Sequence, residues 1–255
     1  ANEAIEDIRS GPERADLAFL HLDLANIASV RQAAEEASHE ERIDLLIDNA
    51  GVMMPPLDHA TAGCELQFAV NHLGHFAFTS LLLHKLEQDG GGRVVVQSSL
   101  AHRGAGIDFD NLDAAKGYSK TQFYGQSKLA NLLFAKELDR RLRASGSSVS
   151  AMACHPGIAQ TEITRHFGPL GSVFGSVVGL ALNSAADGAL PALQAATDPA
   201  AEGGEYYGPY GFREMSGKRS GRAIASTKAK DEALAKRLWD RSVELTGVDP
   251  DLAPA

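Results

Sequence analysis

The stretch Ile43-Asp44-Leu45-Leu46-Ile47-Asp48-Asn49-Ala50-Gly51 decides the fold class. Its apolar run has the length of a buried strand, and the small and polar residues after it end that strand. Apolar residues at helical spacing follow over residues 61–87, and Val94-Val95-Val96 begins the next strand. A strand, a long helix and another strand are the repeating unit of a parallel sheet.

The same alternation continues on both sides of this stretch. We expect further strands at residues 18–22, 149–154 and 206–207, and helices at residues 26–38, 121–143, 184–197 and 231–246. Neither a break in composition nor an internal repeat marks a second domain. The sequence therefore predicts an α/β fold, a doubly wound parallel sheet in three layers, with residues 1–255 forming a single domain.

The composition excludes several classes of protein. The chain has 24 Lys and Arg against 33 Asp and Glu, a formal charge of −9, which argues against a nucleic-acid partner. Its two cysteines, Cys64 and Cys154, lie far apart, which excludes a disulfide framework and predicts a reducing compartment, the cytoplasm. The longest apolar run, residues 170–182, has 13 residues. A membrane span needs roughly 20, so none is expected.

Small and polar residues follow the predicted strands. Asn49, Ala50 and Gly51 come after one strand, and Ser98 and Ser99 come after the next. Ligands of open α/β sheets bind at this end of the strands. Taken singly, each group is also explained by an ordinary turn.

Tyr124 and Lys128 form the strongest chemical signal. They are four residues apart in a predicted helix, so both side chains lie on one face. A free tyrosine has a pKa near 10, and a neighbouring ammonium group brings that value toward neutrality. The pair can therefore transfer protons, although such pairs are also common on solvated helix faces.

Six sequence motifs occur in order along the chain. They are His21-Leu22-Asp23-Leu24, Asp48-Asn49-Ala50-Gly51-Val52-Met53, Leu66-Gln67-Phe68-Ala69-Val70-Asn71-His72-Leu73-Gly74-His75-Phe76, Ser98-Ser99 with Ala101-His102, Tyr124 to Lys128 with Leu129-Ala130-Asn131, and His155-Pro156-Gly157 with Thr161. Together they resemble the short-chain dehydrogenase/reductase family, and more narrowly its retinol-dehydrogenase-like branch. The resemblance covers nearly the whole chain and implies a Rossmann-like sheet with NADP or NAD as cofactor.

The resemblance also implies roles for individual residues. Tyr124 would exchange a proton with the substrate oxygen, and Ser99 would hydrogen-bond that oxygen. Lys128 would lower the Tyr124 pKa and hold the nicotinamide ribose, and Asn71 would anchor a water that connects Lys128 to solvent. The cofactor-binding residues would be Asp23, Leu24, Asn49, Ala50, Gly51, Tyr124, Lys128, Pro156, Gly157 and Thr161. No metal is expected, because the histidines and cysteines lack the spacing of a zinc motif.

The chain departs from the family pattern at its start. The family opens with a strand, a glycine-rich turn that holds the pyrophosphate, a helix and a second strand, whereas residues 1–10 here resemble the helix after them. By the size of a βαβ unit, roughly 40 residues are missing. At about 4.8 Å per strand, the gap between residues 18–22 and 43–47 would be roughly 14 Å.

Two alternatives follow for this N-terminal unit. Either the native protein contains it ahead of residue 1, or the strand at residues 18–22 moves to pair directly with residues 43–47. The mass of the intact protein distinguishes them, because a mass near 27 kDa excludes the first alternative.

The leading functional hypothesis is an NAD(P)-dependent oxidoreductase that interconverts a hydrophobic alcohol and its aldehyde or ketone. Residues 168–183, apolar and rich in glycine, are expected to form a lid over the substrate, with an ordinary packed helix as the alternative. A non-catalytic scaffold that has lost dinucleotide binding is the second hypothesis, and dinucleotide-induced thermal stabilisation would exclude it. The resemblance further implies a homodimer or homotetramer formed by the helices at residues 61–87 and 121–143.

Overall fold

The computed structural model describes residues 2–11, 15–158 and 183–252, and its sheet has the predicted α/β character. Within these residues the sheet has five strands in the order β1-β2-β3-β4-β5. They are β1 (Leu45–Asp48), β2 (Arg93–Gln97), β3 (Ser150–Cys154), β4 (Tyr206–Pro209) and β5 (Ser220–Arg222). Strands β1 to β4 are parallel, as predicted, whereas β5 runs antiparallel to β4 and was not predicted.

The helices begin and end near the predicted residues. They are α1 (Asn2–Arg9), α2 (Ile27–Ala37), α3 (Leu66–Phe68), the π-helical turn η1 (Ala69–Gly74), α4 (His75–Leu86), α5 (Lys120–Ala144), α7 (Ala185–Thr197) and α8 (Glu232–Thr246), with short 3-10 turns η2 (Gln88–Gly90), η3 (Leu100–Gly104), η6 (Phe212–Glu214) and η7 (Lys228–Lys230). Asn26, Ser184 and Asp231 cap α2, α7 and α8, because each side chain accepts a hydrogen bond from a backbone N–H of the first turn. Gly247 ends α8 in the left-handed region, at φ 61°.

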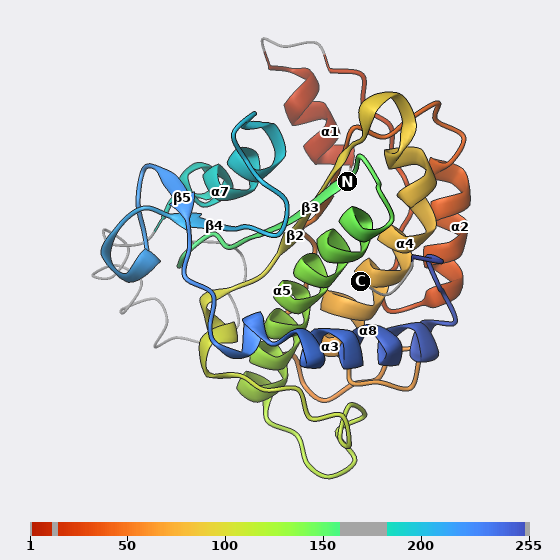
Figure 1. Ribbon diagram of the computed structural model, residues 1–255, viewed down its shortest axis with the longest axis vertical. Helices are drawn as coiled ribbons and strands as arrows, with labels where there is room; N and C mark the ends of the chain where they lie inside the picture. The colour runs from red at the N-terminus through yellow and green to blue at the C-terminus, as the bar shows by residue number, and fades with distance from the viewer. Residues whose placement is uncertain (1, 12–14, 159–182, 253–255) are drawn as a thin grey trace.

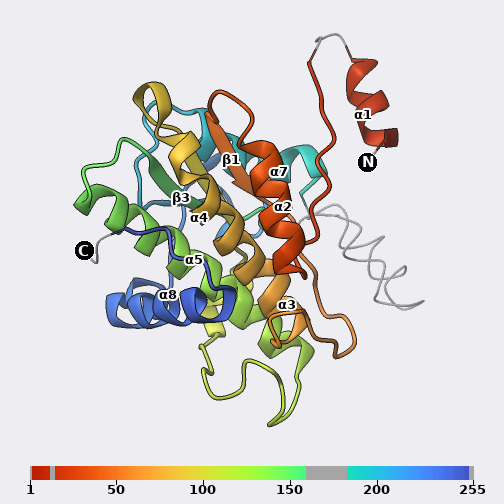
Figure 2. The same cartoon turned by 90° about the vertical axis from the view of Figure 1, so that its right-hand side faces the viewer.

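Helices cover both faces of the sheet (Figure 1). Val94 and Val96 of β2 pack into the main core with α5, while Val95 points the other way and packs with Ala195 of α7. This alternation follows from the two-residue period of a strand. Next to these layers, α2 packs beside α4 and α8 packs across α5 (Figure 2). The outer surfaces of α4 and α5 are thus partly covered within the chain, and the expected homo-oligomer stays a prediction.

The prediction of a strand at residues 18–22 is wrong. Residues 15–23 run as extended chain without strand pairing, and Phe19 is 56% exposed. Strand β1 lies at the edge of the sheet, with β2 as its neighbour. A strand needs a partner for its backbone N–H and C=O groups, which an apolar sequence does not supply by itself. The alternative in which residues 18–22 pair directly with residues 43–47 is therefore contradicted.

The described residues leave two other expectations untested. The predicted lid at residues 168–183 lies outside them except for Asn183, and the single-domain assignment stays a prediction. In the part of the chain that the structure describes, no helix is both long enough and apolar enough to cross a membrane.

Asp48, the last residue of β1, is a buried carboxyl group. It is 2% exposed, and the Thr79 hydroxyl of α4 donates a 2.8 Å hydrogen bond to its Oδ2. Burial raises the pKa of Asp48 to about 7, although the bond from Thr79 opposes this shift. The ionised form therefore destabilises the folded state.

We expect Asp48→Asn to stabilise the protein increasingly as the pH rises. The folded-state pKa lies above the ordinary value of 3.8 for an aspartate, so the wild type loses stability as the pH rises from about 4 to about 7. Asparagine cannot ionise and still accepts the Thr79 hydrogen bond. The gain in unfolding free energy, measured with urea, should be larger by about 2 kcal/mol at about pH 8 than at about pH 5. A gain independent of pH, or one reproduced by the exposed Asp16→Asn, would contradict the assignment.

Candidate active site

A cavity of about 820 Å³ opens at the carboxyl ends of β1, β2 and β3. Residues 49–53, 97–100 and 156–158 follow these strands and form three of its walls, and α5 and α7 contribute the rest. The volume suits a small-molecule site, and the position is the one at which open α/β sheets bind ligands. The edge of the sheet that the sequence predicts to bind ligands therefore borders this cavity.

Tyr124 and Lys128 line this cavity together, one turn apart on α5. Lys128 Nζ lies 6.0 Å from the centroid of the Tyr124 ring and donates a 3.0 Å hydrogen bond to the Gln97 carbonyl. The Ser99 side chain favours the ionised form of the Tyr124 phenol and lines the same cavity. Ser99 Oγ also accepts a 3.2 Å hydrogen bond from the Ala101 N–H, which fixes the hydroxyl at the start of η3. The structure thus brings Tyr124 and Ser99, the two residues expected to act on the substrate oxygen, together with Lys128 in one cavity.

The expected lowering of the Tyr124 pKa is not found. Burial, the larger effect, raises the pKa of Tyr124 above its ordinary value, and the hydrogen bond with Ser99 opposes that shift. Lys128 is itself buried, and burial lowers its pKa to about 8. Burial therefore disfavours the charged form of both groups.

Asn71 lies behind the cavity wall, in the π-helical turn η1. Its Oδ1 accepts a 2.7 Å hydrogen bond from the Val52 N–H, and its Nδ2 donates 2.9 Å bonds to the Val52 carbonyl and to Ser127 Oγ. Turns of this rare type often occur at functional sites. Asn71 thus joins the loop after β1 to α5, while its role in anchoring a water stays a prediction.

The residues of the cavity fit a nicotinamide nucleotide. The Lys128 ammonium has three N–H donors, and among the described residues it bonds one acceptor, the Gln97 carbonyl, so donors remain for ribose hydroxyls. A Cβ on Gly51 would lie 2.8 Å from Asn71 Oδ1, so glycine lets the loop after β1 pack this closely against Asn71. Gly157 has φ +73°, and a Cβ there would come within 2.4 Å of the Met215 carbonyl.

The other predicted cofactor residues divide into two groups. Asn49, Ala50 and Pro156 line the cavity. Asp23 and Leu24 are not among the residues that line it, since Asp23 is exposed and Leu24 is buried in a cluster with α2 and α4. Thr161 lies outside the described residues.

One face of α7 is a wall of the cavity that the sequence analysis missed. Ala185, Gly188, Ala189 and Ala192 line the cavity from this helix. Their spacing of three and four residues places them on one side of the helix, and their small side chains leave room beside them. That periodicity of small residues was the available signal.

The histidines considered for a metal have structural contacts instead. His72 Nε2 hydrogen-bonds Ser242 Oγ at 2.8 Å, and His75 Nδ1 donates to the Asn71 carbonyl at 3.0 Å. Burial lowers the pKa of His72 to about 3 and that of His75 to about 4, so both rings are neutral near pH 7. In residues 2–11, 15–158 and 183–252, no group of His, Cys, Asp and Glu side chains could hold a metal ion.

Comparisons with known proteins agree with this geometry. The sequence model of the family described as short chain dehydrogenase matches residues 1–169. Human retinol dehydrogenase 13 is 41% identical over 255 residues, which span 96% of this chain and 73% of the human protein. The crystal structure of an uncharacterized protein from Mycobacterium paratuberculosis is similar with a TM-score of 0.78 and 35% identity, covering 98% of this chain and 82% of that one. A blue fluorescent protein from a metagenomic library, solved in complex with NADPH, has a TM-score of 0.57 at 25% identity and covers 81% of this chain and 78% of its own.

Proposed function

Since the chain belongs to the short-chain dehydrogenase family, we propose that Tyr124 is the general acid/base of hydride exchange between NADP(H) and a hydrophobic alcohol or carbonyl compound. Membership itself makes the chain an NAD(P)-dependent dehydrogenase/reductase that acts on CH–OH groups, which favours the enzyme over the scaffold. The observation that carries the finer proposal is that Tyr124, Ser99 and Lys128 line one cavity. We propose NADP(H) rather than NAD(H), because the structurally similar blue fluorescent protein was solved with NADPH.

The chemistry divides between the nucleotide and these side chains. A bound nicotinamide supplies or accepts the hydride. In the reducing direction the Tyr124 phenol gives its proton to the carbonyl oxygen, and in the oxidising direction the phenolate takes the proton from the alcohol. The Ser99 hydroxyl, which lines the same cavity as Tyr124, stabilises the charge that develops on the same oxygen.

Lys128 and the neighbouring loops would orient the nucleotide. The donors of Lys128 that the Gln97 carbonyl does not use are available to the ribose hydroxyls. Residues 49–51 would lie along the adenosine side and Pro156 and Gly157 beside the carboxamide, which their places in the cavity wall support. The proposed site also includes three further cofactor-binding residues, Asp23, Leu24 and Thr161. Asn71 would hold the water that connects Lys128 to solvent.

The cavity wall supports an apolar substrate. Val52, Met53, Leu100 and Ile158 line it together with the small residues of α7. Human retinol dehydrogenase 13 is named for a long apolar alcohol, and we propose a substrate of that kind for this chain. Burying an extended hydrocarbon here would contribute most of its binding free energy.

We also propose a reducing location, the cytoplasm, and a homo-oligomeric state. Cys64 and Cys154 are both buried free thiols, which supports a compartment that keeps thiols reduced. Two helices are proposed to pair between subunits. One is the continuous helix formed by α3, η1 and α4, and the other is α5.

Transfer of deuterium from the nucleotide to the product tests the proposed function. NADPH that carries deuterium at the transferred position should label the carbinol carbon of the alcohol formed from a long-chain aldehyde. Because each buried CH₂ contributes about 0.8 kcal/mol, kcat/KM should rise up to about fourfold for each methylene added. Unlabelled alcohol would contradict hydride transfer, and equal kcat/KM for short and long aldehydes would contradict the apolar pocket. Unchanged thermal unfolding at millimolar NADPH and NADH would favour the scaffold instead.

A further inference from the structure

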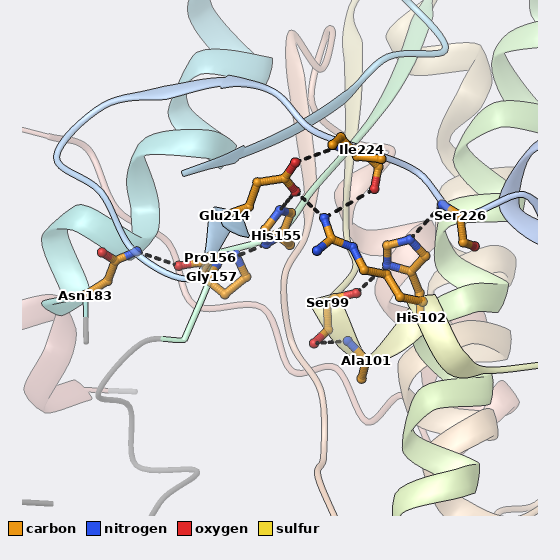
Figure 3. Close-up of polar contacts among 11 residues, drawn as sticks. Ser99, Ala101, His102, His155, Pro156, Gly157, Asn183, Glu214, Ile224 and Ser226 are labelled. Atoms are coloured by element: carbon orange, nitrogen blue, oxygen red, sulfur yellow. Dashed lines mark hydrogen bonds and ion pairs between the residues drawn. The ribbon is translucent and has the colours of Figure 1, made fainter. Parts of the chain in front are cut away.

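The Glu214 carboxylate forms hydrogen bonds with residues of two loops of the proposed site. The first is the segment from Ser99 into η3, and the second is the turn His155-Pro156-Gly157 after β3. Figure 3 shows Glu214 beside His155 and Ile224, with Ser99 and His102 on the neighbouring segment. Glu214 is the last residue of η6 and does not line the cavity, so it can act on the reaction only through these loops.

The His155 side chain joins Glu214 to the second loop. Its Nδ1 lies 3.1 Å from the Gly157 N–H, a group that can only donate, so Nδ1 is the acceptor of that bond. Burial lowers the pKa of His155 to about 3, so the ring is neutral and its one proton is on Nε2. Nε2 lies 3.3 Å from Glu214 Oε2 and donates to it. Glu214 thereby selects the tautomer that accepts the hydrogen bond from the Gly157 N–H.

Arg103 joins the same carboxylate to the first loop. Arg103 NH2 donates a 2.6 Å hydrogen bond to Glu214 Oε2, and the Ile224 N–H donates a 3.0 Å bond to Oε1. Arg103 belongs to η3, which begins directly after Ser99. Within η3, His102 Nδ1 donates to the Ser99 carbonyl at 2.7 Å, and His102 Nε2 accepts a 3.2 Å bond from the Ser226 N–H. The two carboxylate oxygens thus receive three donors, two of which come from the two loops.

The backbone at Glu214 and the ring of Tyr206 are fitted closely to these hydrogen bonds. Arg213 and Glu214 both have positive φ, at 50° and 61°, a conformation that costs conformational free energy in residues other than glycine. The Tyr206 ring packs between the rings of His102 and His155, with centroid distances of 5.4 and 5.1 Å. Backbone strain of this kind persists where neighbouring contacts impose it.

We propose that Glu214 is a positioning residue that sets the Ser99 hydroxyl and the Pro156-Gly157 turn relative to Tyr124. This inference rests on the proposed function, because it assigns Glu214 to the hydride-transfer site. The carboxylate acts through its charge and through having no donor of its own, so that Arg103, His155 and the Ile224 N–H all find acceptors.

Glu214→Gln is the informative substitution because it keeps the size of the side chain. A glutamine presents one oxygen and one NH₂ group, so at least one of the three donors faces another donor. The Oε2 position accepts from both Arg103 and His155, so the glutamine oxygen would take it and the NH₂ group would face the Ile224 N–H. The neutral oxygen is a weaker acceptor for Arg103 and His155 than the carboxylate. Arg103→Met is a milder second variant, since Arg103 is partly exposed and its removal leaves the contact between Glu214 and His155 in place.

The experiment measures the single-turnover rate of hydride transfer at saturating NADPH, per folded molecule, with proton and nitrogen NMR of the His155 ring. Glu214→Gln should slow the transfer at least tenfold and move the His155 Nε2–H proton signal upfield, because a neutral amide oxygen is a weaker acceptor than a carboxylate. Arg103→Met should slow it several-fold with the tautomer retained. Glu202→Gln is the matched control, because Glu202 is an exposed carboxylate paired only with exposed Arg222 in the described residues, and its rate should equal that of the wild type.

The outcomes separate this inference from the proposed function. An unchanged transfer rate in folded Glu214→Gln, or an unchanged His155 Nε2–H proton signal, would overturn the positioning role. A Glu214→Gln protein that does not fold leaves Arg103→Met to decide, since a wild-type rate in that variant also overturns it. If the wild type transfers no hydride, the proposed function fails, and with it the catalytic purpose of Glu214, whereas the NMR still shows whether Glu214 accepts the hydrogen bond from His155.

Discussion

Tyr124→Phe should lower kcat by about 10²- to 10⁴-fold, the usual contribution of a positioned general acid or base. The substitution removes one oxygen atom from a side chain that lines the cavity together with Ser99. The phenyl ring keeps the shape of the site, so the nucleotide should bind with little change. Loss of turnover with retained binding is the signature of a group that transfers a proton rather than one that holds a ligand.

The measurement compares kcat with the dissociation constant for NADPH from fluorescence titration. Tyr210→Phe is the matched control, because Tyr210 is 68% exposed and lies outside the cavity, and its kcat should equal that of the wild type. A Tyr124→Phe variant that retains more than about a tenth of the wild-type kcat would assign the proton transfer to another group.

Lys128→Met should abolish efficient turnover and yet leave the protein at least as stable near pH 7. The ammonium is 5% exposed and bonds the Gln97 carbonyl, and burial lowers its pKa to about 8. Methionine fills a similar volume without a charge to desolvate. We expect kcat/KM to fall by about 10²-fold or more, because the nucleotide loses a hydrogen-bonding cation and the phenolate a neighbouring charge.

The pH dependence of stability gives an independent check on Lys128. Its folded-state pKa lies below the ordinary value of 10.5 for a lysine, so the folded wild type binds this proton less tightly than the unfolded chain does. The resulting penalty is complete below about pH 8 and disappears as the pH rises toward 10.5. After the lost hydrogen bond is subtracted, Lys128→Met should gain about 1 to 2 kcal/mol at neutral pH and lose that gain in alkaline solution. A large loss of stability at pH 7 would show instead that Lys128 holds the fold together.

Features that depend on residues close in the chain were predictable. The helix that carries Tyr124 and Lys128 follows from its periodicity, and four residues of spacing place both side chains on one face. Asp231 and Gly247 mark the two ends of α8 because a carboxylate cap and a left-handed glycine satisfy the free backbone groups there. Residues 49–51 and Ser98 and Ser99 could likewise be assigned to the ligand edge of the sheet, because each group directly follows a predicted parallel strand.

Features that depend on partners distant in the chain were not predictable. Residues 18–22 have the composition of a strand, but strand formation needs a neighbour, and the structure places none beside them. The pKa of Tyr124 was expected to fall because of Lys128, yet burial raises it, and burial is a property of the packed molecule. Glu214 carried no signal at all, because its contacts with Arg103 and His155 join segments separated by more than fifty residues.

The amino-acid sequence by itself determined the kind of sheet, the helices and their ends, and the set of side chains available at one edge. It could do so because hydrogen bonds within a helix and the alternation of side chains along a strand are local. Only the tertiary structure decided which apolar segments find a partner, which face of α7 closes the cavity, and how a carboxylate outside the cavity holds two of its walls. These depend on burial and on contacts between distant segments, which come into existence only when the chain has packed.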